Sequence, residues 1–223
     1  MKKFLLLLIV LFSNSLLSET KIDRIDKNCY SIIEIQKIPS KNSPFTRLNL
    51  SCKKNKRCLN KLNEVLPILN SSDFIYELGA DDEFRNYYSS SNLLITCNKF
   101  GFINIGVYTD GYSGGAHPYH YYTTYIAHIG QDRLLTLTDL VYPTPEFWDF
   151  LSREVSKSIN SSTAEIPKKE DFKVFTLSDT HLEFTFNEYV IGDYASGSFS
   201  GNIPISRIQK FLKPEIKKIY NLK

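Results

Sequence analysis

The stretch Gly114-Gly115-Ala116-His117-Pro118 joins two segments in which β-forming residues alternate with others. Residues 102–109 before it and 119–129 after it are rich in β-branched and aromatic side chains, which favour strands. Adjacent glycines allow the positive φ of a tight connection, and the proline holds the histidine before it in an extended conformation. We therefore predict a turn between two neighbouring strands, with these structural residues: Gly114, Gly115, His117 and Pro118.

Helical periodicity is strongest just after residue 144. Trp148, Leu151, Val155 and Ile159 recur on one face, Pro145 suits a first-turn position, and Thr144 suits an N-cap. A second helix is predicted at 57–69. The remaining strands are expected at 30–38, 93–97, 172–177, 182–186 and 199–205.

The order of these elements shows no regular βαβ alternation, which argues for an α+β fold of mostly antiparallel sheets packed against a few helices. We expect two small subdomains. Their predicted limits are a signal peptide at 1–18, an N-terminal α+β subdomain at 19–130 that contains the glycine turn, and a C-terminal α+β subdomain at 131–223.

The first residues have the pattern of a secretory signal. Lys2 and Lys3 precede an apolar run at 4–12, and serines at 13, 15 and 18 offer cleavage after Ser15 or Ser18. The run is shorter than the roughly 20 residues that span a bilayer, so we favour cleavage over an uncleaved anchor. We therefore expect a secreted or periplasmic protein with no membrane span after cleavage. A net charge of +3 gives no reason to expect nucleic acid as a partner.

Four cysteines in an exported chain indicate disulfides. Of the three possible pairings we predict Cys52–Cys58, which closes a short loop, together with Cys29–Cys97. The other two pairings and a zinc site are the alternatives. The zinc site is disfavoured because the chain has no Cys-x-x-Cys pair.

The sequence has no nucleophile elbow, phosphate-binding loop or His-Glu-x-x-His motif. His117 could act as a base, or bind a metal with His120, but we expect its ring to hydrogen-bond across the turn. Asp139 is expected to cap backbone N–H groups. We therefore predict no catalytic residues, no metal and no cofactor.

Two surfaces are candidates for partner binding. Tyrosines crowd the strand at 119–129, and tyrosine rings give contact area at low entropic cost. An acidic segment would suit a cationic partner. The predicted partner-binding residues are Tyr119, Tyr121, Tyr122, Asp81, Asp82 and Glu83.

The glycine turn, the Leu135–Leu140 segment and the later Phe184–Tyr189 segment together resemble the RsiV-like domain family. The family includes the extracellular part of a lysozyme-sensing anti-sigma factor and an accessory part of a polysaccharide deacetylase. The resemblance implies a role at the cell envelope, with a lysozyme-like protein or peptidoglycan as the partner. It implies no catalytic residue.

We therefore predict an exported, non-enzymatic binding domain of the cell envelope. A hydrolase or deacetylase that acts on peptidoglycan is the first alternative, and a structural envelope protein is the second.

Overall fold

The computed structural model describes residues 18–39, 46–53, 88–112 and 114–222. Several predicted features lie outside these ranges. They are most of the signal peptide, the helix at 57–69, Cys58, and the acidic residues Asp81, Asp82 and Glu83.

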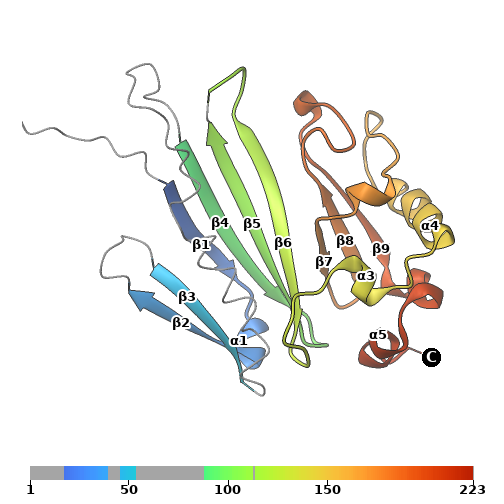
Figure 1. The fold of residues 1–223 in the computed structure, drawn as a ribbon, viewed down its shortest axis with the longest axis horizontal. Coiled ribbons are helices and arrows are strands. Elements are labelled where there is room, and N and C mark those ends of the chain that lie inside the picture. Colours follow the sequence, from blue (N-terminus) through green and yellow to red (C-terminus); the bar gives the residue numbers. More distant parts are fainter. Residues whose placement is uncertain (1–17, 40–45, 54–87, 113, 223) are drawn as a thin grey trace, which may run out of the picture.

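A four-stranded sheet with the order β1-β4-β5-β6 forms the centre of the molecule (Figure 1). Strands β4, β5 and β6 are antiparallel neighbours, whereas β1 pairs with β4 in parallel. The sequence analysis missed β1, whose polar residues lack strand alternation. The bounds are β1 (Ser18–Ile25), β4 (Tyr88–Cys97), β5 (Phe102–Tyr112) and β6 (Tyr119–His128).

A hairpin and one helical turn cover the outer face of this sheet. They are α1 (Cys29–Ile32), β2 (Ile33–Pro39) and β3 (Thr46–Cys52). The predicted strand start at Tyr30 is wrong, because Asp26 accepts the N–H groups of Asn28 and Cys29 and so starts a helical turn. A disulfide joins Cys29 to Cys97, the pairing that the sequence analysis favoured. Cys52 is also disulfide-bonded.

A three-stranded antiparallel sheet of order β7-β8-β9 lies on the other side of the large sheet, with helices on its far face (Figure 1). The molecule is thus layered as hairpin, large sheet, small sheet and helices. The bounds are α3 (Leu137–Leu140), α4 (Pro145–Ser156), η3 (Lys169–Asp171), β7 (Phe175–Leu177), β8 (His181–Phe186), η4 (Tyr194–Ser196), β9 (Phe199–Pro204), η5 (Ile205–Phe211) and α5 (Pro214–Ile219).

Helix α4 forms as its periodicity predicts. The Thr144 hydroxyl accepts the N–H of Phe147 at 3.2 Å, and Pro145 occupies the first turn. Phe147, Leu151 and Val155 are buried against the small sheet. Helix α4 packs closely against β9 at Gly201, where an added Cβ would lie 2.6 Å from the Val155 side chain. Asp139 caps α3, accepting the Thr136 N–H at 2.7 Å, as predicted.

The described residues form two hydrophobic cores. Ile103, Ile105 and Val107 of β5 face the core under the hairpin, as alternation predicts. The other core lies between the small sheet and its helices, and it also takes Phe102 and Ile126 from the large sheet. Sheet and helix content confirm an α+β fold with mostly antiparallel sheets. Within the described ranges, every helix is too short or too polar to traverse a lipid bilayer.

Candidate functional site

A cleft of about 750 Å³ lies between the large and the small sheet. The inner face of the large sheet forms one wall, and β7, β8, β9 and the 187–198 connection form the other. Aromatic rings dominate the first wall, whereas hydroxyl, amide and carboxylate groups dominate the second. The side chains that line the cleft include Tyr108, His120, Tyr122, Glu183 and Asn202.

Two asparagine side chains bridge the two sheets by hydrogen-bonding to the backbone of an edge strand. The amide of Asn104, on β5, accepts the Leu177 N–H at 2.9 Å and donates to the Leu177 carbonyl at 3.0 Å. In the opposite direction, Asn187 after β8 accepts the Tyr122 N–H at 2.7 Å and donates to the Tyr122 carbonyl at 2.9 Å. Each side-chain amide hydrogen-bonds to both the N–H and the carbonyl of one residue on an edge strand of the facing sheet. These two bridges fix the distance between the two walls of the cleft.

Strand alternation places Asn104 and Gly106 on the face of β5 opposite Ile103, Ile105 and Val107. They do point away from the hairpin, but Asn104 is only 3% exposed because the small sheet covers this face. Gly106 is also buried, and an added Cβ would lie 1.7 Å from the Tyr122 hydroxyl. The glycine therefore leaves room for the Tyr122 ring on the cleft wall, and burial raises the pKa of the Tyr122 phenol.

A buried polar network joins the two sheets at the β4–β5 turn. The Asn98 amide donates to the Ser178 carbonyl at 3.1 Å and to the Tyr220 hydroxyl at 3.2 Å. The backbone N–H of Lys99 donates to Asp179 at 2.8 Å. Burial raises the pKa of the Tyr220 phenol above its ordinary value, so the hydroxyl stays neutral and can serve the network.

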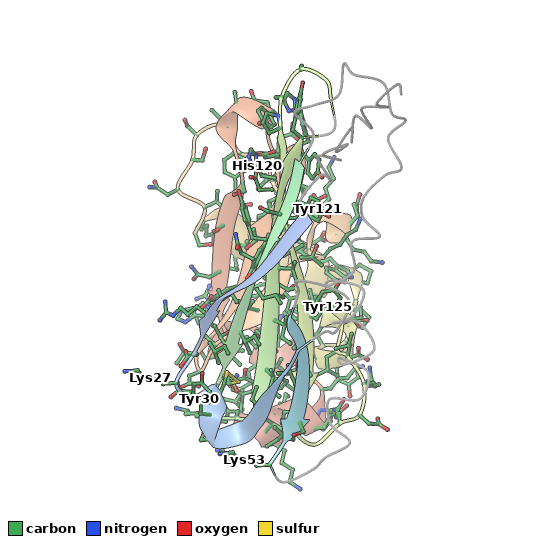
Figure 2. All side chains as sticks on the ribbon, turned by 90° about the vertical axis from the view of Figure 1, so that its left-hand side faces the viewer. Lys27, Tyr30, Lys53, His120, Tyr121 and Tyr125 are labelled. Atoms are coloured by element: carbon green, nitrogen blue, oxygen red, sulfur yellow. A yellow bond between two sulfur atoms is a disulfide. The ribbon has the colours of Figure 1, made fainter. Side chains whose placement is uncertain are left out.

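His120 lies at the opposite end of the cleft, near the glycine turn, as Figure 2 shows. Its Nε2 is 3.0 Å from Asp110 and its Nδ1 is 3.1 Å from Glu188. Both contacts are hydrogen bonds when the imidazole carries two protons. The two carboxylates face opposite ends of the ring, an arrangement that does not converge on one ion. Among the described residues, no group of three His, Cys, Asp or Glu side chains could hold a metal.

The glycine turn is tied to the 187–198 connection. Gly114 and Gly115 have φ of 89° and 116°, the positive values that the sequence predicted. His117 Nδ1 contacts the Pro118 carbonyl at 2.8 Å, and its Nε2 contacts the Tyr189 hydroxyl at 2.9 Å. The ring also stacks on Tyr194, with centroids 3.6 Å apart. The ring thus locks the turn, and it also fastens the turn to the second half of the chain.

The predicted partner-binding tyrosines divide between two positions. The Tyr122 ring lines the cleft beside Gly106. Tyr119 and Tyr121 lie on the other face of β6, where their rings stack with centroids 6.1 Å apart. All three are partly exposed. The sequence analysis missed His120, Asn187 and Glu188 as a set in the cleft, with Asp110 beside His120. The pairing of His120 with Glu188, 68 positions away, has no local signal.

The chain matches no protein-family model and no curated protein. Its fold is similar to the crystal structure of a DUF3298 family member from Bacteroides fragilis, with a TM-score of 0.54 and 15% identity over 84% of this chain and 96% of that chain. A DUF3298 family protein from Pseudomonas aeruginosa PAO1 aligns with a TM-score of 0.49 and 16% identity over 82% and 95% of the two chains. The Bacteroides likeness establishes a shared α+β fold.

Proposed function

We propose that this chain is an exported, non-enzymatic binding domain of the cell envelope and that its inter-sheet cleft takes a glycan of the peptidoglycan class. The cleft carries this proposal. Sugar rings present apolar C–H faces and many hydroxyl groups, so they suit a site that offers aromatic faces on one wall and polar groups on the other. Its volume lies in the range of about 300–1,000 Å³ that is usual for ligand sites.

The chemistry of the walls supports a neutral, hydroxyl-rich ligand. Tyr108 and Tyr122 supply partly exposed rings, and Glu183 and Asn202 supply exposed polar groups across from them. Glu183 contacts only the Thr176 hydroxyl among the described side chains, at 3.5 Å, which leaves acceptor capacity for ligand hydroxyls. The walls are pre-organised by Asn104 and Asn187, which lowers the ordering cost of binding.

Export and family support the cellular setting. Two disulfide-bonded positions, Cys29 and Cys52, suit an oxidising compartment outside the cytoplasm. The signal-like first residues agree with this. The likeness to a DUF3298 protein supports the resemblance to RsiV-like domains, which contain DUF3298, and that family acts at the envelope.

Replacing Tyr108 by alanine is expected to weaken binding to insoluble peptidoglycan about tenfold, because the aromatic face that the ring contributes to the cleft is lost. The measurement is co-sedimentation of the purified protein with peptidoglycan over a range of glycan concentrations. The matched control is Tyr142→Ala, which removes an exposed tyrosine outside the cleft and should bind like the wild type.

Equal binding by the two variants would contradict the cleft as the site, and no sedimentation of the wild-type protein would contradict the glycan ligand. The same incubations test the non-enzymatic part of the proposal. Wild-type protein should release neither soluble glycan nor acetate, and release of either would favour the hydrolase or deacetylase alternative.

A lysozyme-like protein is a second candidate partner, and the exposed aromatic tip favours it. We define this tip as His117, Tyr189, Val190 and Tyr194. Tyr189 is 64% exposed and adopts φ of 65°, a conformation that is unfavourable outside glycine and that concentrates at functional sites. A large ring held outward at a strained position suits insertion into a partner's groove.

If the tip binds a cationic lysozyme, the wild-type protein should be retained on immobilised lysozyme at low and at moderate salt, and Tyr189→Ala should reduce retention about tenfold. Tyr30→Ala, which removes an exposed tyrosine at the opposite end of the molecule, is the control (Figure 2). Absence of retention at both salt concentrations would exclude this partner.

A further inference from the structure

A second groove, of about 670 Å³, lies outside the inter-sheet cleft. It is bounded by the end of β6, by α3 and its preceding loop, by Trp148 of α4, and by residues 169–175. Its lining is chiefly apolar, including Leu134, Trp148, Phe172 and Phe175. Most of these side chains also belong to or pack against the core of the small sheet, so the groove has rigid walls.

Positive charge lies at the rim of this apolar groove. Lys169 and Lys173 line it and are exposed, against a single lining carboxylate, Glu170. The ammonium of Lys169 lies 5.7 Å from the centre of the Trp148 ring. Neither lysine has an ion-pair partner among the described residues. The groove therefore combines an apolar trough with two available cations, which complements a ligand with an apolar body and an anionic head.

Trp148 supplies a separate observation. Its indole Nε1–H is buried and has no acceptor among the described residues. Buried N–H groups are nearly always paired, so an orphaned one in the wall of a groove marks a place where a ligand oxygen would be stabilised. The hydroxyls of Thr136 and Thr138 also line the groove, but they bond to each other and to Asp139, and neither accepts from the indole.

We propose that this groove binds a single-chain amphiphilic carboxylate as a monomer, with its alkyl chain along Leu134, Trp148 and Phe175 and its carboxylate beside Lys169 and Lys173. The charge at the rim favours an anion over a neutral or cationic amphiphile. A site of this kind is independent of the glycan cleft, because the two sets of lining residues do not overlap.

The test uses the fact that Trp148 is the only tryptophan of the chain, so intrinsic fluorescence reports on the groove directly. The purified protein is titrated with decanoate below its micelle concentration and, separately, with 1-decanol. Decanoate should change the Trp148 emission saturably. Lys169→Gln and Lys173→Gln should each weaken decanoate binding about three- to tenfold and leave decanol binding within about twofold.

Two further variants make the outcome decisive. Lys218→Gln removes an exposed lysine of α5, away from the groove, and should bind decanoate like the wild type. Thr138→Phe places a ring in the groove and should abolish the response to both probes while thermal unfolding stays cooperative. The proposal is overturned if decanoate leaves the Trp148 emission unchanged, if decanol binds as tightly as decanoate, or if Lys218→Gln weakens binding as much as the groove variants do.

Discussion

Replacing Cys29 and Cys97 together by alanine should lower the free energy of unfolding by about 4 kcal/mol, the largest loss that we expect from any change described above. The disulfide joins residues separated by 68 positions, and a cross-link over a loop of that length strongly restricts the unfolded chain. It also anchors α1 to the end of β4, so its loss leaves the start of the hairpin layer without a covalent attachment.

Urea denaturation monitored by circular dichroism measures this effect. The double variant Cys29→Ser/Cys97→Ser is the matched control for side-chain volume, since serine nearly preserves the size of cysteine while removing the cross-link. If the cross-link dominates, both double variants lose similar stability. A loss below about 1 kcal/mol in both would show that the remaining structure holds α1 against the sheet without the disulfide.

Asn104→Ala is expected to lower the free energy of unfolding by about 3 kcal/mol. The substitution removes the acceptor of the Leu177 N–H and the shorter of the two hydrogen bonds to the Leu177 carbonyl, which keeps only the 3.4 Å contact from Asn98. Each buried backbone group that loses its partner costs about 1–3 kcal/mol, because water does not replace the bond. The variant should therefore also loosen the contact between the two sheets.

Amide hydrogen exchange separates this specific effect from a general loss of stability. The Leu177 N–H should exchange faster in Asn104→Ala, by more than the change in global stability explains. Asn160→Ala, which truncates an exposed asparagine in the loop after α4, should stay within about 0.5 kcal/mol of the wild type. An Asn104→Ala variant as stable as Asn160→Ala would show that the amide bridge adds little.

Local signals predicted the elements that depend on a few neighbouring residues. Helix α4 follows from the spacing of its apolar residues and from Thr144 and Pro145 at its start, since periodicity and capping are properties of adjacent turns. The turn between β5 and β6 follows in the same way from Gly114 and Gly115. The polar strand β1 was missed because its pairing with β4 has no local pattern of its own.

The candidate site was predicted only in part. Tyr121 and Tyr122 were expected to bind a partner because of their residue type and crowding. The Tyr122 ring lines the cleft, whereas the Tyr121 ring lies on the opposite face of β6. The roles of Asn104, Asn187 and His120 were not foreseen. Each depends on a contact between residues about 65 to 73 positions apart, and an asparagine or histidine has the same local signature whether it bridges two sheets or faces water.

The amino-acid sequence by itself determined the α+β class, the capped helix, the glycine turn and the presence of disulfides, whereas the structure settled the pairing of Cys29 with Cys97. These features follow from spacing, backbone preference and the number of cysteines. Only the tertiary structure decided that a second sheet covers Asn104, that His120 lies between two carboxylates, and that two separate hollows exist. Both the cleft and the groove form where segments distant in the sequence pack together. The packing energy depends on the shapes of both segments, so neither segment alone predicts it.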